Sequence, residues 1–122
     1  MNLDEALQTF IAEGRELLED MEAALLRVAD EADPAESINA IFRAAHTIKG
    51  SAGLFGLDAV VAFTHVVESV LDEVRDGRVP LDGSLLPLML ACCDHIGALV
   101  DAVDAGQQPL DAEGQANGTA LL

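Results

Sequence analysis

Apolar residues recur every three or four positions along four stretches of the chain, which is the spacing of helices that bury one face. These stretches cover about residues 3–29, 34–55, 58–76 and 84–105. The apolar stripe of the first stretch is formed by Leu7, Phe10, Ile11, Leu17, Leu18, Met21, Leu25 and Val28. No stretch shows the alternation of a half-buried strand. Because short connections favour antiparallel neighbours, the pattern predicts an all-α fold, an antiparallel up-down four-helix bundle.

The ends of two helices carry recognisable signals. Asp33 is an expected N-cap, Pro34 fits the first helical position, and Glu36 completes a capping-box pattern. Glycine favours the left-handed backbone that ends many helices, so Gly56 and Gly77 are expected to end the second and third helices.

Hydrophobic periodicity stops near residue 106. The remaining segment is rich in Gly, Gln, Asp, Asn and Ala, a composition typical of a linker. A chain of 122 residues is long enough for one domain and too short for two. We therefore expect one domain over residues 1–105 and a flexible C-terminal linker over residues 106–122.

The charge balance narrows the classes of partner. Six Lys and Arg residues stand against 22 Asp and Glu residues, which gives a formal net charge of −16. This charge argues against binding to nucleic acids and to anionic membrane surfaces, and solubility is its simplest explanation. No uninterrupted apolar run approaches the roughly 18 residues that span a bilayer. The only cysteines, Cys92 and Cys93, are adjacent and do not suit an ordinary disulfide, so we expect a reduced, cytoplasmic protein.

His46 is expected on the solvent side of the second helix. At 100° per residue, the apolar positions of this helix centre about 120° away from His46. These positions are Ile38, Ile41, Ala45, Ile48 and Ala52. Asn39, Gly50 and Gly53 instead lie within about 40° of His46. Each interior glycine costs about 1 kcal/mol of helix stability, so two beside one histidine indicate clearance for a macromolecule. A surface histidine beside accidental glycines is the simpler alternative.

The third helix offers polar residues that are expected to face His46. His65 and Glu68 share a helix face through their three-residue spacing, and Asp72 follows four residues later. If the second and third helices are an antiparallel pair, this line can meet His46. A carboxylate that accepts a hydrogen bond from one ring nitrogen leaves the other nitrogen as a nucleophile. Lys49, three residues after His46, would suit an anion on the ring, although a solvated charge explains it equally well.

A metal site is the rival explanation for histidines and carboxylates in a helical bundle. Di-iron bundles carry paired Glu-x-x-His motifs, whereas this chain has His-x-x-Glu once. Lys49 would also oppose a cation. We therefore expect no metal, and we expect His95 to be an ordinary, partly exposed histidine.

Three segments resemble a known family. The chain contains IFRAAHTIKGSAGLFGL, then FTHVVESVLDEVRDG, and it opens with QTFIAEGRELLEDMEAALL. Together they are similar to the histidine phosphotransfer (HPt) domain of CheA-type chemotaxis kinases, over about residues 3–105. One departure is Ser51, where close relatives often have glycine, and we expect little consequence from it.

The resemblance implies roles for individual residues. His46 would accept the γ-phosphoryl group of ATP and pass it to an aspartate of a response regulator. Glu68 would hydrogen-bond His46, and Lys49 and His65 would complete the polar network. The expected partner-binding surface consists of Phe42, Arg43, Gly50 and Gly53.

The resemblance also implies what partners must supply. The chain contains no glycine-rich nucleotide loop, so we expect no cofactor in this domain, and ATP and Mg²⁺ come with partner domains. The expected partners are CheY/CheB-like receiver domains and an ATP-binding kinase domain, and the isolated domain is expected to be a monomer. It would act in the cytoplasm, in a chemoreceptor cluster. It is either a piece of a protein-histidine kinase or a free phosphotransfer protein. A non-catalytic helical scaffold is the alternative from a different class.

Overall fold

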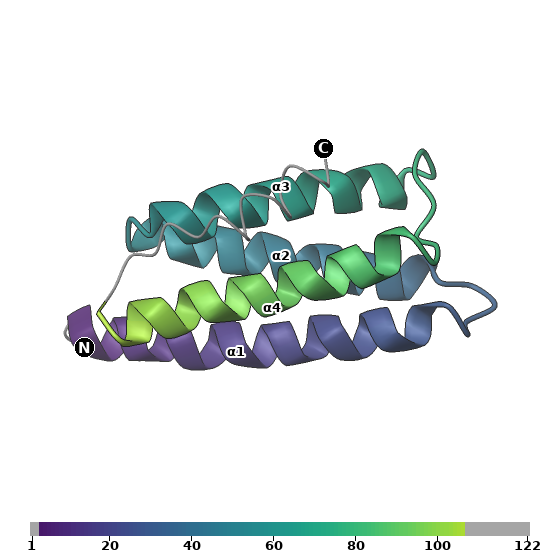
Figure 1. Cartoon of the computed structure of the whole chain (residues 1–122). Coiled ribbons are helices and arrows are strands. Elements are labelled where there is room, and N and C mark those ends of the chain that lie inside the picture. Colours follow the sequence, from purple (N-terminus) through teal and green to yellow (C-terminus); the bar gives the residue numbers. More distant parts are fainter. Residues whose placement is uncertain (1–2, 107–122) are drawn as a thin grey trace.

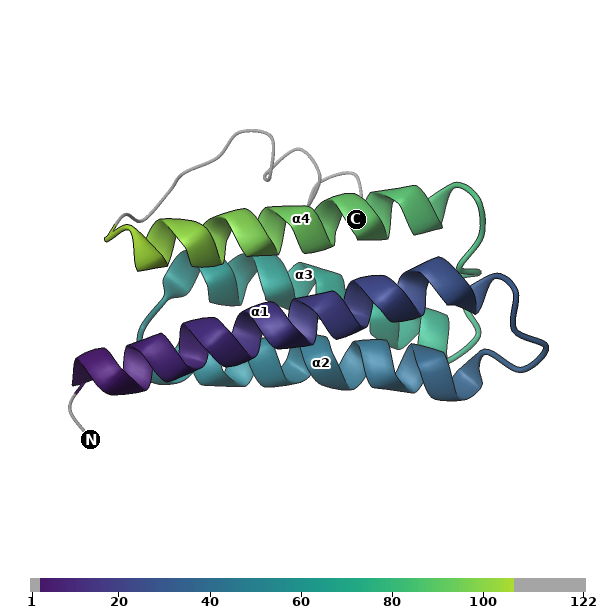
Figure 2. The same ribbon diagram turned by 90° about the horizontal axis from the view of Figure 1, so that it is seen from below.

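The computed structural model describes residues 3–106, which form four helices (Figure 1). They are α1 (Leu3–Val28), α2 (Ala35–Leu54), α3 (Asp58–Arg75) and α4 (Leu85–Asp104). Each helix packs against its neighbours in chain order, and α4 returns to pack against α1. Seen from below, the helices lie side by side with alternating directions (Figure 2). The predicted up-down four-helix bundle is confirmed, with every helix end within one residue of its expected place. Of the predicted linker over residues 106–122, Gly106 forms the turn after α4, and residues 107–122 lie outside the described part.

Gly56 ends α2 as the sequence predicts, and it does so through a specific motif. Its φ of +66° is the left-handed conformation that glycine adopts without strain. The amide of Leu57 donates to the carbonyl of Ala52 at 3.1 Å, and the amide of Gly56 donates to the carbonyl of Gly53 at 3.2 Å. These two hydrogen bonds form a Schellman motif. The end of α2 is therefore held firmly, less than three turns from His46.

The predicted capping box at the start of α2 is wrong. Asp33 Oδ1 does accept a hydrogen bond from the amide of Ala35, at 3.2 Å. Glu36, however, accepts its hydrogen bond from the guanidinium of Arg43, two turns along the helix, at 3.2 Å. A charged donor binds a carboxylate more strongly than a backbone amide does, which explains the exchange of partner.

The core lies between the four helices and consists mostly of aliphatic side chains. The buried apolar residues of α2 are Ile41, Ala44, Ala45, Ile48 and Ala52. Ile38, expected among them, is only half-buried. It lies in the first turn of α2 and lines a hollow of about 210 Å³ with Arg75 at the end of α3. The hollow leaves one side of Ile38 uncovered, so the periodicity overestimated its burial.

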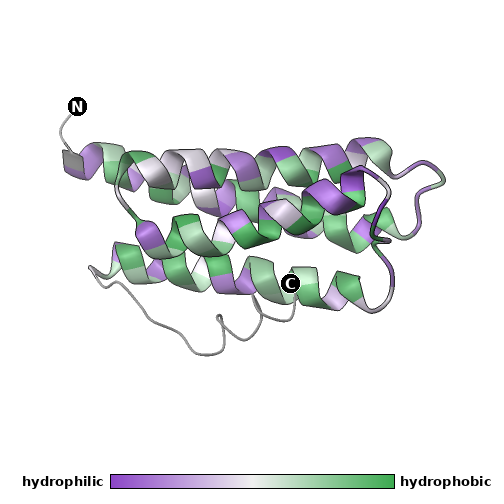
Figure 3. Ribbon diagram, turned by 90° about the horizontal axis from the view of Figure 1, so that it is seen from above, coloured by the Kyte–Doolittle hydropathy of each residue, from purple (hydrophilic) through white to green (hydrophobic). Residues whose placement is uncertain are grey.

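Hydrophilic and hydrophobic residues alternate around each helix (Figure 3), but α4 is the most apolar of the four. By length and composition α4 is long and apolar enough to cross a membrane, although Asp94 and Asp101 interrupt its apolar sequence. Helices buried in the core of a bundle often have the same length and composition. In the bundle α4 buries Met89, Cys92, Cys93, Ile96, Leu99 and Val100. An ion pair of 2.7 Å between Arg15 and Asp101 joins it to α1.

Candidate functional site

His46 on α2 and Glu68 on α3 meet across the antiparallel helix pair. The distance from His46 Nδ1 to Glu68 Oε2 is 3.2 Å. The side chain of His46 is 62% exposed, whereas that of Glu68 is 14% exposed. The structure thus places an accessible imidazole above a largely buried carboxylate, and the exposure of His46 predicted from helical geometry is confirmed.

Lys49 completes this contact from the next turn of α2. Its Nζ lies 2.9 Å from each carboxylate oxygen of Glu68, and its side chain is 22% exposed. Burial of Glu68 raises its pKa, but the hydrogen bonds and charges of Lys49 and His46 outweigh burial, and the pKa of Glu68 is lowered overall. Glu68 is therefore an ionised carboxylate at neutral pH.

The charge of Glu68 fixes the tautomer of His46. An ionised carboxylate accepts hydrogen bonds and donates none, so the hydrogen between Glu68 and His46 belongs to Nδ1. A neutral ring with its hydrogen on Nδ1 has its lone pair on Nε2. The arrangement leaves one nucleophilic nitrogen on an exposed ring.

Phe42 lies beside His46 on the side of the α2 N-terminus, and Arg75 covers the Phe42 ring. The ring of Phe42, one turn before His46, is stacked nearly parallel to the imidazole, with 6.2 Å between centroids and 8° between planes. The guanidinium carbon of Arg75 lies 3.9 Å from the centre of the Phe42 ring. Arg75 also binds Asp72 at 2.7 Å. The four-residue spacing of Phe42 and His46 is visible in the sequence, whereas the approach of Arg75 depends on the register of α2 against α3.

The glycines beside His46 leave open space. Gly50 and Gly53 are exposed, and a Cβ atom added at either position has no heavy atom within 4 Å beyond its chain neighbours and the backbone of its own helix. Arg43 lies beside this strip with its side chain 62% exposed and bound to Glu36. This geometry is compatible with the predicted partner-binding surface, which stays a prediction.

His65 and Asp72 do not join this contact. His65 is exposed on α3, one turn before Glu68, and in residues 3–106 no hydrogen bond or ion pair connects its ring to Glu68 or His46. Both oxygens of Glu68 are already occupied by Lys49 and His46. The network of contacts has three members, and the role expected for His65 stays a prediction. His95 is half-buried on α4 and packs edge-on against Phe63, with 4.5 Å between ring centroids.

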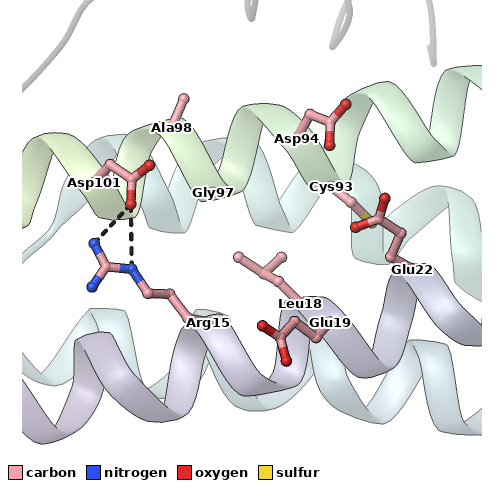
Figure 4. A pocket seen from close by; sticks show the side chains of 9 residues that line it. All are labelled: Arg15, Leu18, Glu19, Glu22, Cys93, Asp94, Gly97, Ala98 and Asp101. Atoms are coloured by element: carbon pink, nitrogen blue, oxygen red, sulfur yellow. Dashed lines mark hydrogen bonds and ion pairs between the residues drawn. The ribbon is translucent and has the colours of Figure 1, made fainter.

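A groove of about 350 Å³ lies between α1 and α4, away from the helix pair that carries His46 (Figure 4). Its polar lining consists of Arg15, Glu19, Glu22, Asp94 and Asp101. Arg15 is engaged by Asp101 along the groove (Figure 4). Within the described part of the chain, no group of three or more His, Cys, Asp or Glu residues could hold a metal ion. The groove has no nucleophile with free access, so the His46 site is the better candidate.

Comparison with protein families gives a match to the Hpt domain over residues 5–106. Among curated proteins, the chain is 42% identical over 109 residues to the chemotaxis protein CheA of Salmonella typhimurium. It is 41% identical over 106 residues to the chemotaxis protein CheA of Rhizobium meliloti. These alignments cover 89% and 87% of this chain but only 16% and 14% of the relatives.

Comparison with solved structures also gives CheA domains. The phosphorylated P1 domain of CheA3 in complex with CheY6 from R. sphaeroides matches with a TM-score of 0.88 and 29% identity, covering 98% of this chain and 94% of that chain. The CheA phosphotransferase domain from Thermotoga maritima matches with a TM-score of 0.78 and 32% identity, covering 85% and 99%. The similarity therefore extends over the whole bundle.

Proposed function

The chain belongs to the Hpt domain family, and from this premise we propose that it is a phosphorelay domain of a chemotaxis two-component system. His46 accepts the γ-phosphoryl group of ATP from a CheA-type kinase domain and donates it to an aspartate of a response regulator. The observation that carries the proposal is the contact between His46 Nδ1 and Glu68, because it directs the lone pair to Nε2 of an exposed ring.

In the first step, the lone pair of His46 Nε2 attacks the γ-phosphorus of ATP. The bond between this phosphorus and the bridging oxygen breaks, and its electron pair leaves with ADP. Nδ1 keeps its hydrogen, so the phosphorylated ring carries a positive charge next to the Glu68 carboxylate. Glu68 stabilises that charge, and Lys49 balances the negative charges of the carboxylate and the phosphoryl group.

In the second step, an aspartate oxygen of the receiver attacks the phosphorus. The bond between phosphorus and Nε2 breaks, and its electron pair returns to the ring. An in-line displacement requires the two protein surfaces to touch around His46. The exposed ring and the open space at Gly50 and Gly53 support such an approach. The similar P1 domain of CheA3 was solved in its phosphorylated form in complex with CheY6, which supports such a partner.

ATP and Mg²⁺ belong to the partner domains in this proposal. The curated relatives are about six to seven times longer than the matched region, which leaves room in them for a separate ATP-binding domain. We place the domain in the cytoplasm, at a chemoreceptor cluster, since its relatives are chemotaxis proteins.

The test is a two-stage labelling experiment on the full 122-residue chain. ATP labelled in its γ-phosphoryl group and the ATP-binding domain of a CheA-type kinase should give a label on this chain that is lost in acid and retained in base. Addition of a CheY-type receiver with Mg²⁺ should then remove the label. A chain that binds the kinase domain but takes no label would be a scaffold, and the proposal would be wrong.

A further inference from the structure

The ring of Phe42 lies parallel to the imidazole of His46, one turn earlier on α2. The two ring planes are within 8° of parallel and their centroids are 6.2 Å apart, which is the range of offset aromatic pairs. The hydrogen bond to Glu68 determines which nitrogen of His46 keeps the lone pair. One hydrogen bond at 3.2 Å does not fix the plane of a side chain that is 62% exposed. The stacked ring of Phe42 supplies the second constraint.

Phe42 is itself held in place by two kinds of contact. It is half-buried and packs against the hydrophobic core. The guanidinium carbon of Arg75, on α3, lies 3.9 Å from the centre of the ring, which is the geometry of a cation–π contact. The guanidinium is in turn bound to Asp72 at 2.7 Å. A series of contacts therefore runs from α3 through Phe42 to His46.

The ion pair of Arg75 does not by itself explain where its guanidinium lies. Arg75 and Asp72 are three residues apart on α3, so they can pair without approaching α2. Arg78 shows this alternative, because it binds Glu73 and Asp76 just beyond the end of the same helix. The placement of the Arg75 guanidinium over a ring of the neighbouring helix therefore depends on Phe42.

We propose that Phe42 is a positioning residue for phosphoryl transfer, and that Arg75 holds the Phe42 ring in position. This inference rests on the proposed function. In-line displacement requires Nε2 of His46, the phosphorus and the oxygen that leaves or attacks to be aligned. A rotation of the imidazole moves Nε2 off that line, and a misplacement of about 1 Å can cost around a hundredfold in rate. Because both steps use the same nitrogen, Phe42 serves acceptance and donation alike.

Positioning differs from partner binding in its kinetics. A residue that only binds one partner changes the KM for that partner, whereas a residue that aims the nucleophile changes the kcat of both steps. Phosphoramidate, a small phosphoryl donor, gives a third reaction. Nε2 of His46 attacks its phosphorus, and the phosphorus–nitrogen bond of the donor breaks as ammonia leaves. This donor diffuses freely and meets the ring in any orientation, so its reaction depends on the lone pair of Nε2 and little on the plane of the ring.

The experiment uses the 122-residue chain and its variants Phe42→Leu, Phe42→Tyr, Arg75→Gln and Arg78→Gln. Three reactions are measured: labelling from ATP by the kinase domain, transfer to a CheY-type receiver, and labelling by phosphoramidate. Phe42→Leu keeps the apolar bulk but removes the flat face. It should lower kcat about tenfold or more with both protein partners and leave KM unchanged, while the phosphoramidate rate changes by less than about twofold.

The other variants are matched to this one. Phe42→Tyr keeps the flat face and should keep kcat with both partners. Arg75→Gln should lower both kcat values about two- to fivefold, the range that an exposed cation–π contact allows. Arg78→Gln makes the same change of charge without a contact to Phe42 among the interactions described, and should lower neither.

Melting curves establish that each variant is folded, and NMR couplings report the side-chain rotamers of His46. Averaging between rotamers should increase in Phe42→Leu and stay unchanged in Phe42→Tyr. An unchanged kcat in Phe42→Leu, a change confined to the KM for one partner, or an equal loss of the phosphoramidate reaction would overturn the positioning role. Equal losses in Arg75→Gln and Arg78→Gln would overturn the part assigned to Arg75. A parent chain that takes no label from ATP would contradict the proposed function instead, and the couplings of His46 would still decide whether Phe42 orients the ring.

Discussion

At the scale of the residue, the two ring nitrogens of His46 have different roles in the site. Glu68 occupies Nδ1, and Nε2 keeps the lone pair. Glu68 is itself held by Lys49, with 2.9 Å from Nζ to its oxygens. Removal of Glu68 or of Lys49 should therefore slow phosphorylation without abolishing it, because Nε2 of His46 remains.

Glu68→Gln tests the orienting role. The amide is similar in shape but has no negative charge, so it stabilises the phosphorylated ring less and supports the reactive tautomer poorly. We expect phosphorylation to slow by about tenfold to a thousandfold without being abolished. The measurement is the initial rate of labelling from ATP at fixed kinase domain. An unchanged rate would make Glu68 a structural carboxylate only.

The lowered pKa of Glu68 has a consequence for stability against pH. A carboxylate with a folded-state pKa below its unfolded value of about 4.5 stabilises the fold above that value. This contribution is lost as pH falls through the lower, folded-state pKa. The free energy of unfolding of the parent chain should therefore approach that of Glu68→Gln as the pH falls from 6 to 3. Urea unfolding of both proteins measures the two free energies of unfolding. A difference between them that grows as the pH falls would contradict the lowered pKa of Glu68.

At the scale of the element, α2 has glycines with opposite roles. Gly53 is within the helix, where an added Cβ would point into open space, whereas Gly56 has a φ of +66°. Gly53→Ala should stabilise the protein by up to about 1 kcal/mol. Gly56→Ala, the matched control, should destabilise it by about 1–2 kcal/mol. Thermal melts of the two variants give the comparison.

Gly50→Leu and Gly53→Leu test whether the open space beside His46 is needed for the approach of a receiver. These variants should stay folded but transfer phosphoryl poorly to a receiver, because a branched side chain holds the partner away from His46. A displacement of an ångström or so can cost around a hundredfold in rate. Normal transfer by both variants, in a time course on phosphorylated protein, would show that the glycines do not serve the partner.

The elements were predictable from the sequence where the signal is local. Helical periodicity located each helix, and the glycines at 56 and 77 located two ends, since a positive φ is a property of one residue. The capping box failed because Arg43 competes for Glu36 from two turns away. Such competition depends on side-chain conformation, which a pattern of residue types does not contain.

At the scale of the whole molecule, the net charge of −16 opposes compactness. Screening by salt should relieve that repulsion. We expect the melting temperature at neutral pH to rise by several degrees between about 10 mM and 200 mM NaCl, where the Debye length falls from about 30 Å to below 10 Å. A melting temperature that falls with salt would mean that the surface ion pairs, such as Arg15–Asp101, outweigh the repulsion.

Part of the candidate site could be predicted from the sequence, because the antiparallel arrangement of α2 and α3 determines which faces meet. An antiparallel α2–α3 pair brings the exposed side of His46 next to the polar line of α3, and the structure joins His46 to Glu68 at 3.2 Å. The helical spacing did not distinguish Glu68 from its neighbours His65 and Asp72 on that line. The contact of Arg75 with Phe42 was likewise invisible, because it depends on the axial register of two helices.

The central claim is that His46 is the phosphorylated nucleophile, and His46→Gln tests it most directly. The chain retains His65 and His95 as internal controls in this variant. The parent chain, incubated with labelled ATP and the kinase domain, should take a label that is lost in acid and retained in base. The variant should keep its helical content and take no label, since the amide has no nucleophilic ring nitrogen. A label retained by the folded variant would place the phosphoryl group on another residue and contradict the account.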